Sequence, residues 1–310
     1  MISCTDFIPA YNELFKYIDQ NYGHDHVLKF WDYLFKPDGK GIPLINYLKK
    51  DGLKGAFDYW VMISDEEACD VTRIINVKQG WLKNHMEYCP SKGRLLKLKE
   101  ELGIEPYAYY CDHCDYYRAA LKEVGLEYIR DHTCVDRASC SSMIIDPTVF
   151  RGKLDKDENT IVATFSSDGK EYFHPDFHSS LNMGVEYLGI TYGEEAIKDF
   201  LMKYAKAVYR KIIENARQNG LPVLQEMILD TYKREHALDA ISINLDNNVL
   251  SVQVHNCPAV HHLTKTGRTV THWFSLTTSV VMETIASECG YHFVMGTYDP
   301  ETGKTSYQFS

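Results

Sequence analysis

The chain has 310 residues, of which 45% are hydrophobic and 25% charged, an ordinary globular balance that excludes a disordered chain. Its formal net charge is −10 at pH 7, and a nucleic-acid or membrane-surface partner is not expected because either needs a basic face. No stretch approaches the roughly 20 apolar residues that span a bilayer. The opening residues MISCTDFIPAYNELF do not resemble a signal peptide and the nine cysteines are odd in number, so we predict a cytoplasmic protein with reduced thiols.

The first predicted elements are three helices. A stripe with the 3.6-residue helical period precedes Tyr22-Gly23, where glycine can take the positive φ that ends a helix. The stripe consists of Phe7, Tyr11, Leu14, Phe15 and Ile18. A second apolar stripe at helical spacing follows, formed by Val27, Phe30, Trp31 and Leu34. A third helix is expected to begin near Pro43, because proline suits a first helical turn.

Strands are predicted further along the chain, where the period changes from 3.6 to 2. Apolar and polar residues alternate over 241–254, and Asn247-Asn248 in the middle tolerates the positive φ of a tight hairpin turn. A helix is expected around 280–285. A last hairpin would pair GYHFVMGTY with TSYQF across residues 300–303.

The chain also repeats itself. When residue n is set against residue n+170, seven of the 27 positions from 4 to 30 are identical, and a Cys-Pro pair follows in each copy, at Cys89 and at Cys257. We therefore predict an α+β fold with two tandem copies, each of three helices followed by a ββαββ antiparallel sheet, packed as a pseudo-dimer. The copies are expected at 1–150 and 174–310, with an exposed linker at 151–173.

Cys257 is the first candidate for chemistry, because it comes just before a predicted helix. The helix dipole stabilises a thiolate at this place, and His255 and His262 lie close by in the segment VHNCPAVHHL. One of these imidazoles would be the base for a Cys257 nucleophile. The alternative is a small buried residue at a tight strand–helix junction, a role that also fits Cys89.

His174 and His178 form a second candidate site. They are four residues apart in HPDFH, so on a helical turn they would share a face and could hold a divalent metal such as zinc. The first copy has Cys4 and Ile8 at these positions, which makes the second copy the expected functional half. Pro175 indicates that the helix begins only there, and the alternative is a pair of capping or surface histidines.

Four cysteines of the first copy resemble a zinc or iron–sulfur ligand set. They are Cys111 and Cys114 in YCDHC, followed by Cys134 and Cys140. Cys114, however, also falls on an apolar helical stripe, which predicts a buried core position for it. The alternative is therefore a group of free buried thiols. The sequence contains no glycine-rich phosphate loop and no dinucleotide fingerprint, so no nucleotide cofactor is expected.

Several short motifs resemble the L-2-amino-thiazoline-4-carboxylic acid hydrolase-like family of small bacterial proteins. They are NYGHDHVLKFW and TYGEEAIKDFL in the helices, VHNCPAVHHL at the strand–helix junction, and D-P-x-x-G-x-x-x-Y-x-F from Asp299 to Phe309. Each copy would correspond to about one such domain. The first copy ends in RASCSSMII without the last motif, which is typical of a degenerate copy. The resemblance implies hydrolysis of a cyclic C–N or C–S amidine.

The leading hypothesis is a hydrolase that acts on a small non-peptide compound, a cyclic amidine or a carboxylate-bearing molecule, with help from a thiol or a metal. The first alternative is a small-molecule binding or sensor module without catalysis. The second is a structural pseudo-dimer in which one copy supports the other. The 22 tyrosines favour a ligand pocket, because a tyrosine hydroxyl needs a partner that a core rarely provides.

Overall fold

The computed structural model describes residues 1–36 and 43–310, and it divides the chain into two compact units. The first unit comprises 1–21, 98–104 and 175–310, and the second comprises 22–97 and 105–174. Each unit combines helices with one antiparallel sheet, so the predicted α+β class is confirmed. In the described part of the chain, no helix is both long and apolar enough to cross a bilayer.

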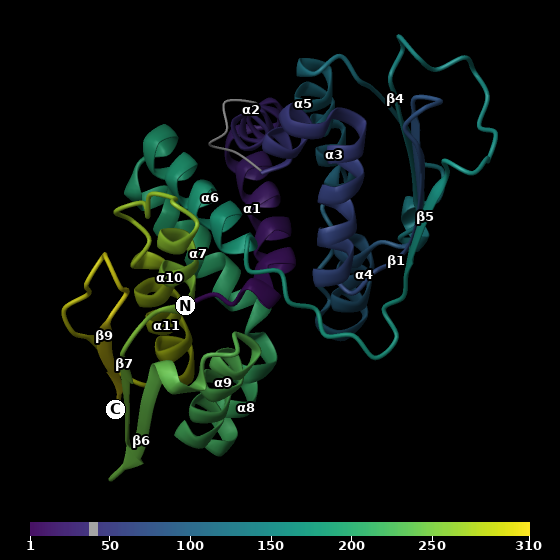
Figure 1. Cartoon of the computed structure of the whole chain (residues 1–310). Coiled ribbons are helices and arrows are strands. Elements are labelled where there is room, and N and C mark those ends of the chain that lie inside the picture. Colours follow the sequence, from purple (N-terminus) through teal and green to yellow (C-terminus); the bar gives the residue numbers. More distant parts are fainter. Residues whose placement is uncertain (37–42) are drawn as a thin grey trace. The chain divides into compact units, whose positions relative to one another are not determined.

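The first unit holds a four-stranded sheet with helices packed against it (Figure 1). Its helices are η1 (Cys4–Asp6), α1 (Phe7–Tyr22), α6 (Phe177–Tyr192), α7 (Glu194–Val208), α8 (Arg210–Asn219), α9 (Leu221–Arg234), η4 (Leu238–Ala240), α10 (Pro258–Lys265) and α11 (Leu276–Cys289). Its strands are β6 (Ile241–Asp246), β7 (Val249–Val254), β8 (Phe293–Met295) and β9 (Thr305–Phe309), in the order β6-β7-β9-β8. Helix α9 contacts β6 and β7, and it covers their apolar face.

The predicted hairpins of this unit are both present. Ile243 pairs with Val252 across β6 and β7, and Asn247 and Asn248 in the turn have φ of 47° and 64°. Two successive residues with positive φ match the right-handed twist of the flanking strands. The last hairpin pairs Phe293 with Phe309, as the alternation in TSYQF predicts.

The second unit is built on a five-stranded sheet. Its helices are α2 (His24–Leu34), α3 (Leu44–Glu66), α4 (Pro90–Leu102), η2 (Tyr110–Tyr116), α5 (Tyr117–Glu123) and η3 (Val135–Arg137), and the end of α4, from residue 98, belongs to the first unit. Its strands are β1 (Asp70–Asn76), β2 (Trp81–Tyr88), β3 (Glu127–Asp131), β4 (Cys140–Ile145) and β5 (Ile161–Phe165), in the order β3-β4-β2-β1-β5. Helix α3 lies along this sheet (Figure 1), and its Leu48 and Phe57 share one buried core with Leu82 and Ile144 of the strands.

The two sheets have the same strand order, because β3-β4-β2-β1 corresponds to β8-β9-β7-β6 in chain order. Four details differ from the expected copies. Four helices, α6 to α9, precede the second sheet instead of three, and two helices rather than one separate the hairpins in each half. The expected linker 151–173 contains the edge strand β5, which pairs with β1. The N-terminal helix α1 is grouped with the second half of the chain, so the units do not follow the expected boundaries.

Gly23 and Gly193 occupy equivalent turns between consecutive helices. Their φ values are 91° and 88°, and their ψ values are 162° and 170°. Glycine reaches this region without steric cost, whereas a side chain would be strained there. The positive φ predicted for Gly23 is therefore confirmed, and Gly193 shares it.

Candidate functional site

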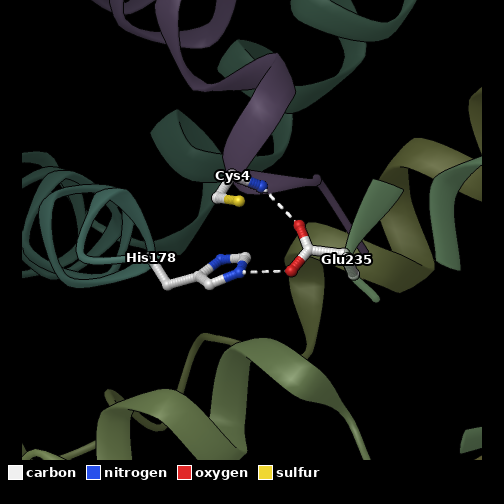
Figure 2. Close-up of side chains that lie close together, drawn as sticks. All are labelled: Cys4, His178 and Glu235. Atoms are coloured by element: carbon white, nitrogen blue, oxygen red, sulfur yellow. Dashed lines mark hydrogen bonds and ion pairs between the residues drawn. The ribbon is translucent and has the colours of Figure 1, made fainter. Parts of the chain in front are cut away.

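Three side chains from separate segments of the first unit converge on one buried point (Figure 2). They are Cys4, His178 and Glu235, whose potential ligand atoms all lie within 4.8 Å of one another. Cys4 and His178 are each 1% exposed and Glu235 is 6% exposed. Buried ionisable groups of three different ligand types rarely meet without a chemical or structural reason, so this cluster is the main candidate site.

Ion pairing between two segments positions the cluster. Glu235 directly follows α9, and the preceding Arg234 donates to both carboxylate oxygens of Asp6, at 2.6 and 3.2 Å. A two-pronged arginine–carboxylate pair fixes orientation as well as distance. It holds η1 against the end of α9 and thereby brings Cys4 to Glu235. His178 arrives from the first turn of α6.

Glu235 accepts hydrogen bonds at both carboxylate oxygens. Oε1 accepts from the Ser3 hydroxyl and from the Cys4 backbone N–H, each at 2.6 Å, and Oε2 accepts from His178 Nε2 at 3.0 Å. Burial opposes ionisation, but these bonds and the His178 charge outweigh it and lower the pKa of Glu235 to about 2. The cluster therefore contains a fixed negative charge at neutral pH.

The same bonds fix the tautomer of His178. A carboxylate only accepts hydrogen bonds, so Nε2 must carry a proton and the lone pair of the neutral ring lies on Nδ1. Nδ1 is buried and has no hydrogen-bond partner among the described residues. In Figure 2 the Cys4 side chain lies beside the imidazole ring. An unpartnered lone pair next to a thiol can accept a proton or bind a metal ion.

The two histidines of the predicted metal pair have different partners. Helix α6 begins at Phe177, so His174 precedes it and the expected shared helical face does not exist. The His174 ring is hydrogen-bonded to Glu66 in the second unit, whereas His178 binds Glu235 in the first. Only His178 belongs to the Cys4–His178–Glu235 cluster.

Cys257 lies at the N-terminus of a helix as predicted, but burial of the thiol outweighs the expected stabilisation of its thiolate. The residue is 5% exposed and caps α10, and burial raises the pKa of its thiol although backbone N–H groups oppose the rise. Its sulfur contacts Met1 Sδ at 3.4 Å. The expected bases have other partners, because His255 is bonded to Ser242 at 2.8 Å and His262 contacts Asp176 at 3.5 Å.

His262 nevertheless lies close to the cluster, since its ring centroid is 6.2 Å from that of His178. His255 is exposed and directly follows β7. Of the five residues that the sequence indicated, the structure therefore brings His178 and His262 together, and it gives His174, His255 and Cys257 other partners.

Packing explains why Cys257 lies next to the Asp299–Phe309 motif. The Cys257 N–H donates to the Thr302 carbonyl at 2.9 Å, and a Cβ added to Gly303 would lie 2.3 Å from the Cys257 Cβ. Gly303 also has φ of 68°. A small residue at 257 and a glycine at 303 are thus required by the close approach of two backbone segments, as the structural alternative predicts.

The expected four-cysteine set is only partly assembled. Cys111, Cys114 and Cys140 influence one another electrostatically and are joined by Cys89, whereas the Cys134 sulfur accepts from Arg137 at 3.1 Å. Cys114 is half-buried and not in the core, and residues 110–116 form a 3₁₀ helix instead of a regular α-helix. All nine cysteines are free of disulfides.

Sequence reasoning missed Cys4 and Glu235 as functional residues. Cys4 had been considered only as the counterpart of His174. A signal for Glu235 did exist, because a glutamate at the C-terminus of a helix is unfavourable in the helix dipole. A residue kept there against its electrostatic preference indicates a specific partner. The partner itself lies 231 residues away and could not be inferred from spacing.

Comparison of the chain with protein-family models, with curated proteins and with solved structures gives no significant match. The function therefore has to be argued from the geometry and chemistry of the residues themselves.

Proposed function

We propose that the protein is a metal-dependent hydrolase of a small non-peptide compound, with Cys4, His178 and Glu235 as its centre. The observation that carries this proposal is the convergence of a thiol, an imidazole and a carboxylate within 4.8 Å, with His178 Nδ1 buried and unpartnered. Zinc prefers these donor types, and three protein ligands leave a fourth position for water or substrate. A metal bound there would supply a hydroxide nucleophile at neutral pH.

The donor set fits a zinc ion chemically. Ligands around tetrahedral zinc lie about 3.4–3.8 Å apart, so atoms within 4.8 Å need to approach by about 1 Å. Cys4 Sγ, one ring nitrogen of His178 and one carboxylate oxygen of Glu235 would be the three ligands, because one such atom from each residue lies within 4.8 Å of the others. An ion bound to His178 Nε2 and Glu235 Oε2 would replace the hydrogen bond that joins these two atoms.

Burial of the centre supports a small substrate. A peptide could not reach residues that are 1–6% exposed without extensive unfolding, whereas a small molecule needs only local opening. The predicted substrate class, a cyclic amidine or a carboxylate-bearing compound, agrees with this restriction and with the family resemblance of the motifs.

A thiol mechanism is the second candidate, because the geometry also matches a nucleophile–base–orienter triad. Glu235 holds the His178 tautomer whose lone pair is on Nδ1, and the Cys4 side chain lies beside the ring (Figure 2), so the imidazole could accept the thiol proton without a metal. Metal content distinguishes the two candidates, since only the first requires a bound ion.

The alternative of a binding or sensor module is supported by a separate feature. A groove of about 420 Å³ lies on the β6, β7 and β9 strands, and it presents polar side chains that include Ser242, Asn244, Gln253 and Gln308. A shallow, open groove favours reversible binding of a small ligand over catalysis, because it does not exclude water from the bound molecule, although Ser242 has a base beside it, His255 at 2.8 Å.

A tandem duplication belongs to the same proposal. It is supported by the common strand order and by the matching junctions of Cys89 and Cys257, whose N–H groups donate to Ala138 and Thr302 in the loops before the last strands. Phe7 and its counterpart Phe177 stack with ring centroids 4.2 Å apart. Within the first unit, this contact joins the first helices of the two proposed copies.

Metal analysis tests the metal-dependent function. Protein incubated with Zn²⁺ and desalted should retain about one zinc per chain, and His178→Ala and Cys4→Ala should lower this to background. His255→Ala is the matched control, because this exposed histidine lies outside the cluster. A wild-type chain without stoichiometric zinc, or a His178→Ala variant that retains it, would refute the metal centre. Zinc-dependent hydrolysis of a cyclic amidine, lost in His178→Ala, would support the hydrolase.

Glu235→Gln tests the role of the Glu235 carboxylate in zinc binding without changing the size of the side chain. The glutamine amide donates where Oε2 accepted, so His178 Nε2 must accept and its Nδ1 must carry the proton. We expect zinc affinity to fall about 10- to 100-fold. Glu226→Gln, an exposed position on the same helix α9, should leave the affinity unchanged. Equal affinities of the two variants would show that Glu235 neither binds the metal nor orients His178.

A further inference from the structure

The second unit contains an unusual helix that carries two cysteines. Helix η2 runs from Tyr110 to Tyr116 in the 3₁₀ conformation, although 3₁₀ runs longer than three or four residues are uncommon. With three residues per turn, Cys111 and Cys114 lie on the same face. Their Cα atoms are then about 6 Å apart, a separation that a disulfide can bridge.

Cys114 is paired with the adjacent histidine. The Cys114 sulfur lies 3.6 Å from His113 Nε2, while His113 Nδ1 donates to the Tyr110 carbonyl oxygen. A carbonyl only accepts, so Nδ1 holds a proton and Nε2 is the nitrogen that takes the proton of the thiol. Transfer of this proton gives a thiolate–imidazolium pair, the arrangement that activates cysteine nucleophiles.

The surroundings favour the thiolate. Burial opposes it, but His113 and Arg130 lower the pKa of Cys114 overall, and burial raises the pKa of Cys111 to about 12. The Arg130 side chain is 5% exposed and donates to the Cys111 carbonyl at 2.9 Å. The titratable and charged groups that act on Cys114 or respond to it are His113, Arg130, Asp115, Cys89, Cys111, Cys140, Tyr117 and Tyr128.

We propose that Cys114 and Cys111 form a dithiol site that exchanges with low-molecular-mass disulfides, with Cys114 as the attacking thiolate and His113 as its imidazolium partner. Cys114 is half-buried and therefore reachable by a small reagent. This activity is independent of the metal centre, whose residues all belong to the first unit.

The exchange balances in two steps. The Cys114 thiolate attacks one sulfur of a disulfide R–S–S–R, the S–S bond breaks, RS⁻ leaves, and a Cys114–S–S–R mixed disulfide forms. Cys111 then loses its proton to RS⁻ and attacks the Cys114 sulfur, which releases the second RS⁻ and closes the Cys111–Cys114 disulfide. Two protein thiols are oxidised and one external disulfide is reduced to two thiols.

A cationic side chain distinguishes this site from a metal site. Arg130 stabilises the Cys114 thiolate, but it would repel a divalent cation bound to the same sulfur. Among the described residues, the short mutual spacing expected of a preformed metal site occurs at Cys4, His178 and Glu235 and not around Cys114. Thiol chemistry therefore suits this cluster better than zinc.

Mass spectrometry of the full chain treated with glutathione disulfide tests the proposal. The wild type should lose two thiols and give a peptide with a Cys111–Cys114 disulfide. Cys111→Ser should stop at a glutathione adduct on Cys114, because the resolving thiol is missing. Cys114→Ser should give neither product, whereas Cys289→Ser, a half-buried cysteine in the first unit, should behave as the wild type.

The His113→Asn variant shows whether Cys114 reacts because His113 activates its thiol or only because the thiol is accessible. Asparagine cannot take the thiol proton, so the rate of adduct formation at pH 6 should fall about 20-fold and recover as the pH rises above 8. Circular dichroism confirms that the variant is folded. An adduct placed equally on Cys114 and Cys289, a closed disulfide at another pair, or a His113→Asn rate equal to the wild-type rate would each overturn the proposal.

Discussion

Cys4 in the first unit and Cys114 in the second each lie beside a histidine ring. In both rings, one nitrogen is hydrogen-bonded to an oxygen acceptor, Glu235 for His178 and the Tyr110 carbonyl for His113. The third partner differs. Cys4 shares its site with the Glu235 carboxylate and is 1% exposed, whereas Cys114 has the Arg130 guanidinium nearby and is half-buried. The thiol–imidazole pair of the first unit therefore lies beside a negative charge, and that of the second unit lies near a positive charge.

This difference decides which chemistry each cysteine suits. A buried negative charge disfavours a lone thiolate but favours a metal cation, which can neutralise both the carboxylate and the sulfur. A positive charge stabilises the thiolate and repels a cation. Cys257 shows that a helix N-terminus alone is insufficient, because burial raises the pKa of its thiol despite the backbone N–H groups.

Selective alkylation offers the sharpest way to break this comparison. With iodoacetamide at pH 6, Cys114 should react about 20-fold faster than Cys289, because His113 and Arg130 lower the pKa of Cys114 whereas burial raises the pKa of Cys289. Cys4 should remain unmodified until the protein unfolds, since it is buried. Peptide mapping over time measures the three rates. Labelling of Cys4 at the rate of Cys114 would contradict the assignment of different roles.

Local features could be predicted from the sequence, whereas the site could not. The alternation in 241–254 and Asn247-Asn248 predicted a hairpin correctly, because strand period and turn chemistry are encoded in neighbouring residues. Residues 110–116 were predicted as an α-helix, yet they form a 3₁₀ helix whose Cys111 carbonyl accepts a hydrogen bond from Arg130, 19 residues further along the chain. Local propensity does not report such tertiary contacts.

The candidate site required long-range information. His178 was among the predicted residues, but its partners Cys4 and Glu235 lie 174 and 57 positions away. The chain brings them together through η1, α6 and the end of α9, and no pattern of neighbouring residues fixes the contacts among these three segments. The repeat was also misleading at this point, since it set Cys4 and His178 in separate copies.

The pH dependence of the free energy of unfolding tests whether the first site contains a negative charge on Glu235. In the metal-free protein, the pKa of Glu235 lies below its ordinary value of 4.5, at about 2, so the carboxylate stabilises the fold above pH 4.5. This contribution should fade as the pH falls from about 4.5 to about 2, by roughly 3 kcal/mol in total. Urea unfolding of wild type and Glu235→Gln between pH 7 and pH 2 measures it. A difference between the two proteins that stays constant with pH would show that Glu235 is not ionised in the fold.

The smallest expected effect concerns Cys257, the cysteine that we assign to packing. Gly303→Ala places a Cβ 2.3 Å from the Cys257 Cβ at a residue with φ of 68°, so it suffers both backbone strain and overpacking. Gly267→Ala is the matched control, because Gly267 has φ of 73° but no atom within 4 Å of an added Cβ. Both variants should lose about 1 kcal/mol to strain, and Gly303→Ala should lose a further 1–3 kcal/mol through the clash. Denaturant unfolding measures both losses. If the two variants were equally stable, the backbone would not approach Cys257 closely enough to require glycine at 303, and a role for Cys257 beyond packing would have to be considered again.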